Sequence, residues 1–141
     1  MIKLIRDGLL AQLNTLKGAW QPLAKVYDYM TLDIQWYPCA MIHFDNVQGE
    51  YGDSNHNKRI YNFVIYVMQE IKNVDRNTAT DSVENIIDKI TNLIDSSDEL
   101  DGLVNNIQAT GGDISEYNNG SDGRYIWGVI TINLEQFYQI H

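Results

Sequence analysis

The chain has 141 residues and a net charge of −9, and 44% of its residues are hydrophobic. This length predicts a single domain over residues 1–141 with one sizeable core, and the hydrophobic content excludes a disordered chain. No apolar run reaches the roughly 18 residues that a membrane-spanning helix needs. The one cysteine, Cys39, excludes an internal disulfide and fits a reducing cytoplasm.

The negative charge is distributed unevenly along the chain. The first 72 residues carry equal numbers of acidic and basic side chains, so all of the net charge lies after residue 72. Such a surface repels nucleic acid. Two interpretations stay open at this point: the charge serves solubility, or it lets DNA slide past without sticking.

The first predicted element is an amphipathic helix over Ile2–Lys17. Its apolar residues recur at helical spacing, and Gly18 follows them as a C-terminal cap. Pro22 breaks a continuing helix. We therefore expect Ala19–Trp36 to be a connector, with no more than a short turn or strand near Lys25–Tyr29.

Two strands, Tyr37–Asp45 and Arg59–Lys72, are predicted next. The first alternates in polarity, and the second is rich in aromatic and β-branched residues. The segment Asn46–Lys58 between them is rich in Gly, Asp and Asn, which predicts a long polar hairpin arm. Because this arm holds little apolar surface, we expect a neighbouring subunit to order it.

A second helix is predicted to begin at Thr80 or Asp81. Glu84 completes a capping-box-like pattern with Asp81, and an isoleucine-rich stripe continues to Ile94. The segment before this helix, Asn73–Thr80, is expected to be a polar loop. The acidic segment that follows it is expected to be a solvated loop.

The last two strands are predicted at Leu103–Thr110 and Arg124–Gln136. A bulge or turn at Gly111-Gly112 interrupts the first of them, and Ile114–Tyr117 can resume it. The order of elements predicts an α+β fold with a mixed or antiparallel four-stranded sheet. Two helices pack on one face of this sheet, and the long hairpin arm projects from it.

One face of the predicted sheet has more apolar residues than the helices can cover. Arg59–Lys72 is apolar on both sides, and the last strand presents Tyr125 and Trp127 opposite its isoleucines. Aromatic surface with few charges is typical of protein interfaces. This face either contacts other subunits or is covered by the connector within the chain.

No pattern in the sequence predicts catalysis or metal binding. The candidate soft-metal ligands lack the spacing of a zinc site: His43, His56, His141 and Cys39. The segment Asp53–Asn57 opens like a calcium loop but lacks the required glycine and glutamate. We therefore expect no catalytic residue, no metal, no cofactor and no enzyme.

Four features, taken in order, carry a resemblance to a known family. They are the amphipathic helix Ile2–Lys17, the aromatic-proline strand Tyr37–Ile42, the polar hairpin that leads into Arg59–Val67, and the isoleucine-rich helix Val83–Ile94 with its acidic end. In pattern and order the chain resembles the phage tail terminator, or tail-completion, family. The resemblance implies a non-enzymatic virion protein of the phage neck that is assembled in the host cytoplasm. Such proteins form rings, usually hexamers, which cap the tail tube and join it to the head connector.

The resemblance also implies the partners and the surfaces that meet them. The partners are further copies of the chain, the tail tube protein and a head-closure or connector protein; genomic DNA passes without specific binding, and no membrane is involved. The expected subunit-interface residues are Tyr51, Asp53, Lys58, Arg59, Tyr125 and Trp127. Asp113 and Glu116 are expected to face the lumen.

Three alternatives stay open at the level of sequence. Head-closure and tail-adaptor proteins of the phage neck share this size and α+β character. A module of a different class would bind a small ligand or a peptide in a pocket between the sheet and the helices. An enzyme would use His43 with a nearby carboxylate.

Overall fold

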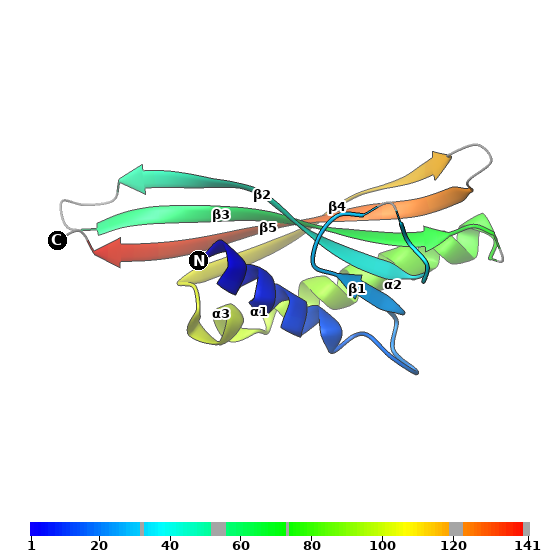
Figure 1. Cartoon of the computed structure of the whole chain (residues 1–141), viewed down its shortest axis with the longest axis horizontal. Helices are drawn as coiled ribbons and strands as arrows, with labels where there is room; N and C mark the ends of the chain where they lie inside the picture. The colour runs from blue at the N-terminus through cyan, green and yellow to red at the C-terminus, as the bar shows by residue number, and fades with distance from the viewer. Residues whose placement is uncertain (32, 52–55, 73, 119–122, 140–141) are drawn as a thin grey trace.

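The computed structural model describes residues 1–31, 33–51, 56–72, 74–118 and 123–139. In these residues a five-stranded mixed sheet carries three helices on one of its faces (Figure 1). The helices are α1 (Ile2–Asn14), α2 (Arg76–Asp95) and α3 (Asp98–Gly102). The strands are β1 (Lys25–Tyr27), β2 (Cys39–Tyr51), β3 (His56–Glu70), β4 (Asn106–Asn118) and β5 (Arg124–Gln139).

The strands lie in the order β1-β2-β3-β5-β4. β1 pairs with β2 in parallel, whereas the other neighbours are antiparallel. The α+β class is therefore as predicted, but the expected four strands and two helices omit β1 and α3. β1 lies where a short turn or strand was expected near Lys25–Tyr29, although it was not counted in the sheet. α3 has only five residues and is too short to develop a periodic pattern.

The two longer helices begin or end differently from their predictions. α1 ends at Asn14, three residues before Lys17. α2 begins at Arg76 because the carboxylate of Asp75 accepts a hydrogen bond from the Thr78 backbone N–H at 2.7 Å. Asp75 is therefore the N-cap, and the predicted start at Thr80 or Asp81 is wrong.

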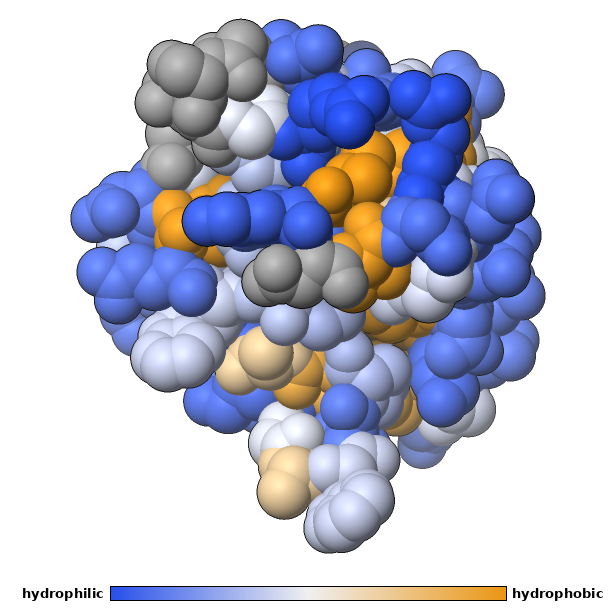
Figure 2. All heavy atoms as spheres, turned by 90° about the vertical axis from the view of Figure 1, so that its right-hand side faces the viewer, coloured by the Kyte–Doolittle hydropathy of each residue, from blue (hydrophilic) through white to orange (hydrophobic). Residues whose placement is uncertain are grey.

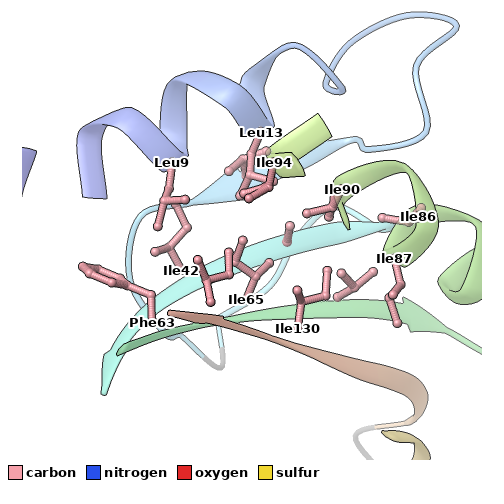
Figure 3. Close-up of a cluster of buried hydrophobic side chains, with 14 of the residues drawn as sticks. Leu9, Leu13, Ile42, Phe63, Ile65, Ile86, Ile87, Ile90, Ile94 and Ile130 are labelled. Atoms are coloured by element: carbon pink, nitrogen blue, oxygen red, sulfur yellow. The ribbon is translucent and has the colours of Figure 1, made fainter. Parts of the chain in front are cut away.

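The core lies between the helices and the adjacent face of the sheet (Figure 3). Leu9 of α1 points toward Ile42 of β2, whereas Leu13 lies beside Ile94 of α2. α2 contributes a stripe of isoleucines: Ile86, Ile87, Ile90 and Ile94. On β5 every second residue is buried, as the alternation predicts: Ile126, Gly128, Ile130, Ile132 and Leu134.

β4 contains the interruption that the paired glycines predict. Its register against β5 shifts between Gly111 and Ile114. A Cβ atom on Gly112 would lie 2.9 Å from the backbone oxygen of Val129, so this position admits only glycine without a backbone shift. The strand resumes beyond the bulge and continues to Asn118.

The polar segment predicted as a hairpin arm continues the paired strands of the sheet. β2 and β3 stay paired through it, with Gln48 opposite Ile60 and Gly49 opposite Arg59. β5 runs beside β3 along the same length. We call this three-stranded extension, residues 46–51, 56–62 and 133–139, the arm. It reaches past the helices at the end of the sheet where β2 and β3 meet (Figure 1).

The acidic segment after α2 is a short left-handed turn. Asp98, Glu99, Leu100 and Asp101 have φ between 52° and 60°. This conformation costs L-residues roughly 1–2 kcal/mol each. The three acids are exposed as expected, but Leu100 is buried against Gly8 of α1, so the segment is not simply a solvated loop.

Candidate subunit-interaction surfaces

The face of the sheet opposite the helices is rich in aromatic side chains. On β3, Tyr61, Phe63, Ile65 and Val67 are buried toward the helices. The alternation then places Tyr66 and Met68 on the opposite face, next to Trp127 and Val129 of β5. These four side chains are partly exposed, and no helix covers them.

The connector covers part of this face. Met41 and Cys39 of β2 are 1% and 0% exposed, although they point away from the helices. A cavity of about 390 Å³ lies between the connector and the open sheet. Its lining residues are Met30, Thr31, Ile34, Tyr37, Met41, Tyr66, Met68, Tyr117, Tyr125 and Trp127. We call this cavity the aromatic pocket. The connector therefore covers part of the face, and contact of the remaining part with other subunits stays a prediction.

The rings of the aromatic pocket are in mutual contact. The centroid of Tyr125 lies 5.8 Å from that of Tyr37 and 6.0 Å from that of Tyr117, and both pairs are stacked. The centroids of Tyr66 and Trp127 are 5.9 Å apart. These distances fall within the range of favourable aromatic pairs.

The pocket is uncharged but has an acid beside it. Burial, with a smaller contribution from Tyr125, raises the pKa of Tyr37, so its hydroxyl stays neutral at physiological pH. The nearby carboxylate of Glu70, which pairs with Tyr125 in the sheet register, adds to this effect. Among the described residues, no lysine or arginine lines the cavity. The site therefore suits an apolar or aromatic group and disfavours an anion.

The end-on view shows the hydrophobic and polar surface at one end of the molecule. Figure 2 looks at the end that lies on the right of Figure 1, where β4 and β5 join. Hydrophobic atoms come to the surface there between polar side chains. The hydrophobic surface at this end is therefore broken into small areas and does not form one broad patch.

The predicted interface residues fall into two separate regions. Tyr125 and Trp127 both line the aromatic pocket. Lys58 and Arg59 lie in the arm, at the other end of β3. Tyr51 is the last residue of β2, and Asp53 lies outside the described residues.

Lys58 has a partner within its own chain. Its Nζ lies 3.7 Å from Oε1 of Glu135 on β5. Arg59 is exposed and, with Met1, Ile2, Lys3, Val47 and Tyr61, lines a shallow hollow of about 380 Å³ between the arm and the start of α1. The arm therefore offers a mixed surface with both polar and apolar side chains.

The two predicted lumen residues have different surroundings. Asp113 is exposed within the bulge of β4. Glu116 lies on the helix side, where its Oε2 is 2.9 Å from Nε of Arg76 and its Oε1 is 3.8 Å from Nη1 of Arg124. Its negative charge is locally compensated, which weakens the case for Glu116 as a repulsive lumen residue.

Comparison of the sequence with models of known protein families gives no match, and comparison with curated proteins gives none either. Functional inference therefore depends on the arm, the aromatic pocket and the charge distribution.

The described residues contain no group of three or more His, Cys, Asp or Glu side chains placed to hold a metal ion. His43 lies on the open face with its ring centroid 6.4 Å from that of Tyr66. Burial raises the pKa of the Cys39 thiol to about 12, which leaves almost no thiolate near neutral pH.

None of the described helices is long and apolar enough to cross a membrane.

The sequence predicted the aromatic strand residues of the pocket and left open that the connector covers this face, but it did not identify the connector residues that form the other wall. Met30, Thr31 and Ile34 come from the connector, for which no more than a short turn or strand near Lys25–Tyr29 was predicted. The apolar residues Met30 and Ile34 were the available signal that the connector packs against the protein, since large apolar side chains are uncommon in a fully solvated linker.

Proposed function

We propose that the chain is a structural subunit of a tailed-phage neck, which assembles into a ring, caps the tail tube and joins it to the head connector. The observation that supports this most is the arm. Its three strands continue beyond the helical layer, and apolar side chains such as Val47 and Phe137 remain 44% and 50% exposed on it. A surface of this kind is stabilised by contact with another molecule.

A ring requires two different surfaces on each subunit, because neighbours meet head to tail. The arm and the aromatic pocket meet this requirement. Lys58 in the arm and Met68 in the pocket are ten positions apart on β3, which corresponds to roughly 33 Å along an extended strand. Each subunit therefore has two unlike contact regions at opposite ends of one sheet.

The charge distribution agrees with a channel through which DNA passes. The outer side of α2 carries the exposed acids Asp81, Glu84 and Asp88, and Asp113 is exposed on β4. Acidic groups near a DNA path prevent adhesion through repulsion that salt screens. In this proposal Asp113 faces the lumen, while Glu116 helps to hold α2 to β4 and β5.

A second candidate function is favoured by one specific observation, the size of the aromatic pocket. A volume of about 390 Å³ lies within the range of roughly 300–1,000 Å³ typical of small-ligand sites. The cavity lies on the face opposite the helices and not between sheet and helices, where a ligand module was expected to have it. This alternative predicts a monomer or dimer that binds a small apolar molecule.

Shortening the arm tests the proposal. Residues 49–59 are replaced by Asn-Gly, which joins Gln48 to its register partner Ile60 through a two-residue hairpin turn. The chain is ended at Glu135, the residue that pairs with Ile60 on β5. Buried Tyr61 and Leu134 stay in place, so the core should still form.

Light scattering of the wild-type and shortened chains, each alone and mixed with tail tubes, provides the measurement. We expect the wild type to form a closed ring, most simply a hexamer, at high concentration or at a tube end. The shortened chain should unfold cooperatively but stay monomeric. A wild-type chain that remains monomeric and does not bind tubes would contradict the proposal.

A further inference from the structure

One large aromatic side chain, that of Trp20, lies entirely in solvent. Trp20 is 102% exposed, so the rest of the chain does not cover its indole. Its φ is +68°, a conformation that is uncommon for a bulky residue. Both features cost free energy in the isolated subunit, which points to a contact that the isolated subunit lacks.

The turn that carries Trp20 is held by backbone hydrogen bonds. The N–H of Gly18 donates to Leu23 O at 3.1 Å, and the N–H of Leu23 donates to Leu16 O at 2.9 Å. The N–H of Gln21 donates to Gly18 O at 3.1 Å. Trp20 is thus presented on a closed turn, so less conformational entropy is lost when a partner binds it.

The same chain contains a cavity with the matching chemistry. The aromatic pocket combines five aromatic rings with three methionines, and its volume of about 390 Å³ leaves room for one indole. Stacked and edge-on ring contacts add stabilisation beyond the burial of apolar area. Tryptophan is also among the side chains that contribute most to protein interfaces.

Trp20 does not fill the pocket of its own subunit. Its turn projects from the side of the sheet that carries the helices, whereas the pocket lies on the opposite face (Figure 1). Full exposure of Trp20 agrees with this separation. The pocket and the tryptophan can therefore meet only between two copies.

We propose that Trp20 of one subunit inserts into the aromatic pocket of the next subunit. The inference rests on the proposed ring assembly and names one of its contacts. A projecting apolar group and a complementary pocket elsewhere on the same molecule produce head-to-tail contacts, which close into a ring when the rotation allows.

Charges beside the two surfaces favour the same pairing. Lys17 lies three residues before Trp20, is exposed, and forms no ion pair with any described residue. Glu70 lies beside Tyr37 and Tyr125 of the pocket. Insertion of Trp20 would bring the Lys17 ammonium toward this carboxylate. A charge pair at the rim mainly fixes orientation and contributes little affinity.

Trp20→Ala tests the contact, with Trp36→Ala as the matched control. Trp36 is also exposed, at 62%, and is not among the residues that line the pocket. Sedimentation equilibrium should show self-association weakened at least about 30-fold by Trp20→Ala, the factor that corresponds to about 2 kcal/mol for an interface hot spot. Trp36→Ala should leave it nearly unchanged. Equal association of the two variants would overturn the proposal.

Mixing two defective variants tests whether the contact is between copies. Met68→Trp fills the pocket from the sheet but leaves Trp20 intact, whereas Trp20→Ala leaves the pocket open. Each variant alone should stay monomeric. Together they should form one-to-one dimers that grow no further, because one tryptophan and one open pocket remain per pair.

The outcomes separate this contact from the ring proposal. Rings formed by Trp20→Ala at the same concentrations as the wild type, or the absence of dimers in the mixture, would overturn the Trp20 contact and leave the ring proposal intact. A wild-type chain that stays monomeric at every concentration and on tail tubes would overturn both.

Discussion

α2 approaches β5 so closely at Gly128 that a side chain does not fit between them. A Cβ atom at this position would lie 2.4 Å from Cδ1 of Ile87 and 3.1 Å from Cγ1 of Val83. Carbon atoms in favourable contact are about 3.5–4.0 Å apart. Gly128→Ala must therefore displace Ile87 or shift the helix. Overpacking of this kind lowers the free energy of unfolding by about 1–3 kcal/mol.

Shortening Ile87 should relieve the clash that Gly128→Ala creates. Ile87→Val removes Cδ1, and by itself this truncation should cost about 0.5–1.5 kcal/mol. In the presence of Gly128→Ala it removes the closest contact, so the double variant should be no less stable than Gly128→Ala alone. The coupling between the two sites should reach at least about 0.5 kcal/mol.

Urea unfolding followed by circular dichroism measures these differences. Gly49→Ala is the control, because a Cβ atom there meets no heavy atom within 4 Å. Its effect should stay within about 0.5 kcal/mol. If Gly128→Ala behaves like this control, or if the effects of Gly128→Ala and Ile87→Val simply add, the described packing of α2 on the sheet is wrong.

Further predictions concern two titratable groups. The thiol of Cys39 should resist a thiol reagent at pH 8 until the protein unfolds, because burial raises its pKa to about 12; rapid labelling of the native protein would contradict this. The free energy of unfolding should also fall as pH rises from about 8.5 toward 12, since the unfolded thiol ionises first, and Cys39→Ala should remove this part of the slope. Asp75→Ala should lower the melting temperature through loss of the N-cap. Because the hydrogen bond from Thr78 lowers the pKa of Asp75, this difference should shrink below about pH 4, and a difference that persists there would argue against a carboxylate cap.

The elements that sequence reasoning predicted well are those whose burial imposes a period. Ile5, Leu9 and Leu13 are all buried along α1, and Ile130 and Ile132 alternate with partly or fully exposed residues on β5. These patterns exist because one face of each element must meet the core. The patterns predicted the elements themselves, and they also predicted which side of β5 faces the helices.

A hairpin arm was predicted, but the continuation of β2, β3 and β5 through it was not, because these strands are held there mainly by backbone pairing. Gln48 and Ile60 face each other in a register that continues from the core, and β5 adds a third strand. Most side chains in this stretch are polar, so the sequence shows no apolar alternation that would predict these strands. The start of α2 was missed for a related reason, since Asp75 and Asp81 are both chemically suitable caps and only the local backbone decides between them.

The candidate site was predictable on its strand side only. The aromatic residues opposite the helices follow from alternation once β5 is oriented, and they include Tyr125 and Trp127. The pocket itself depends on where the connector crosses the open face. That path is determined by tertiary packing of Met30 and Ile34, which a local pattern does not encode.

The central claim, that this chain caps a tail tube, is tested most directly by imaging tail tubes after incubation with a gold-labelled chain. The account predicts label at one end of each tube and none along the sides. A parallel sample with the shortened arm should show unlabelled tubes. Label absent from the tube ends, or scattered evenly along the tubes, would contradict the account.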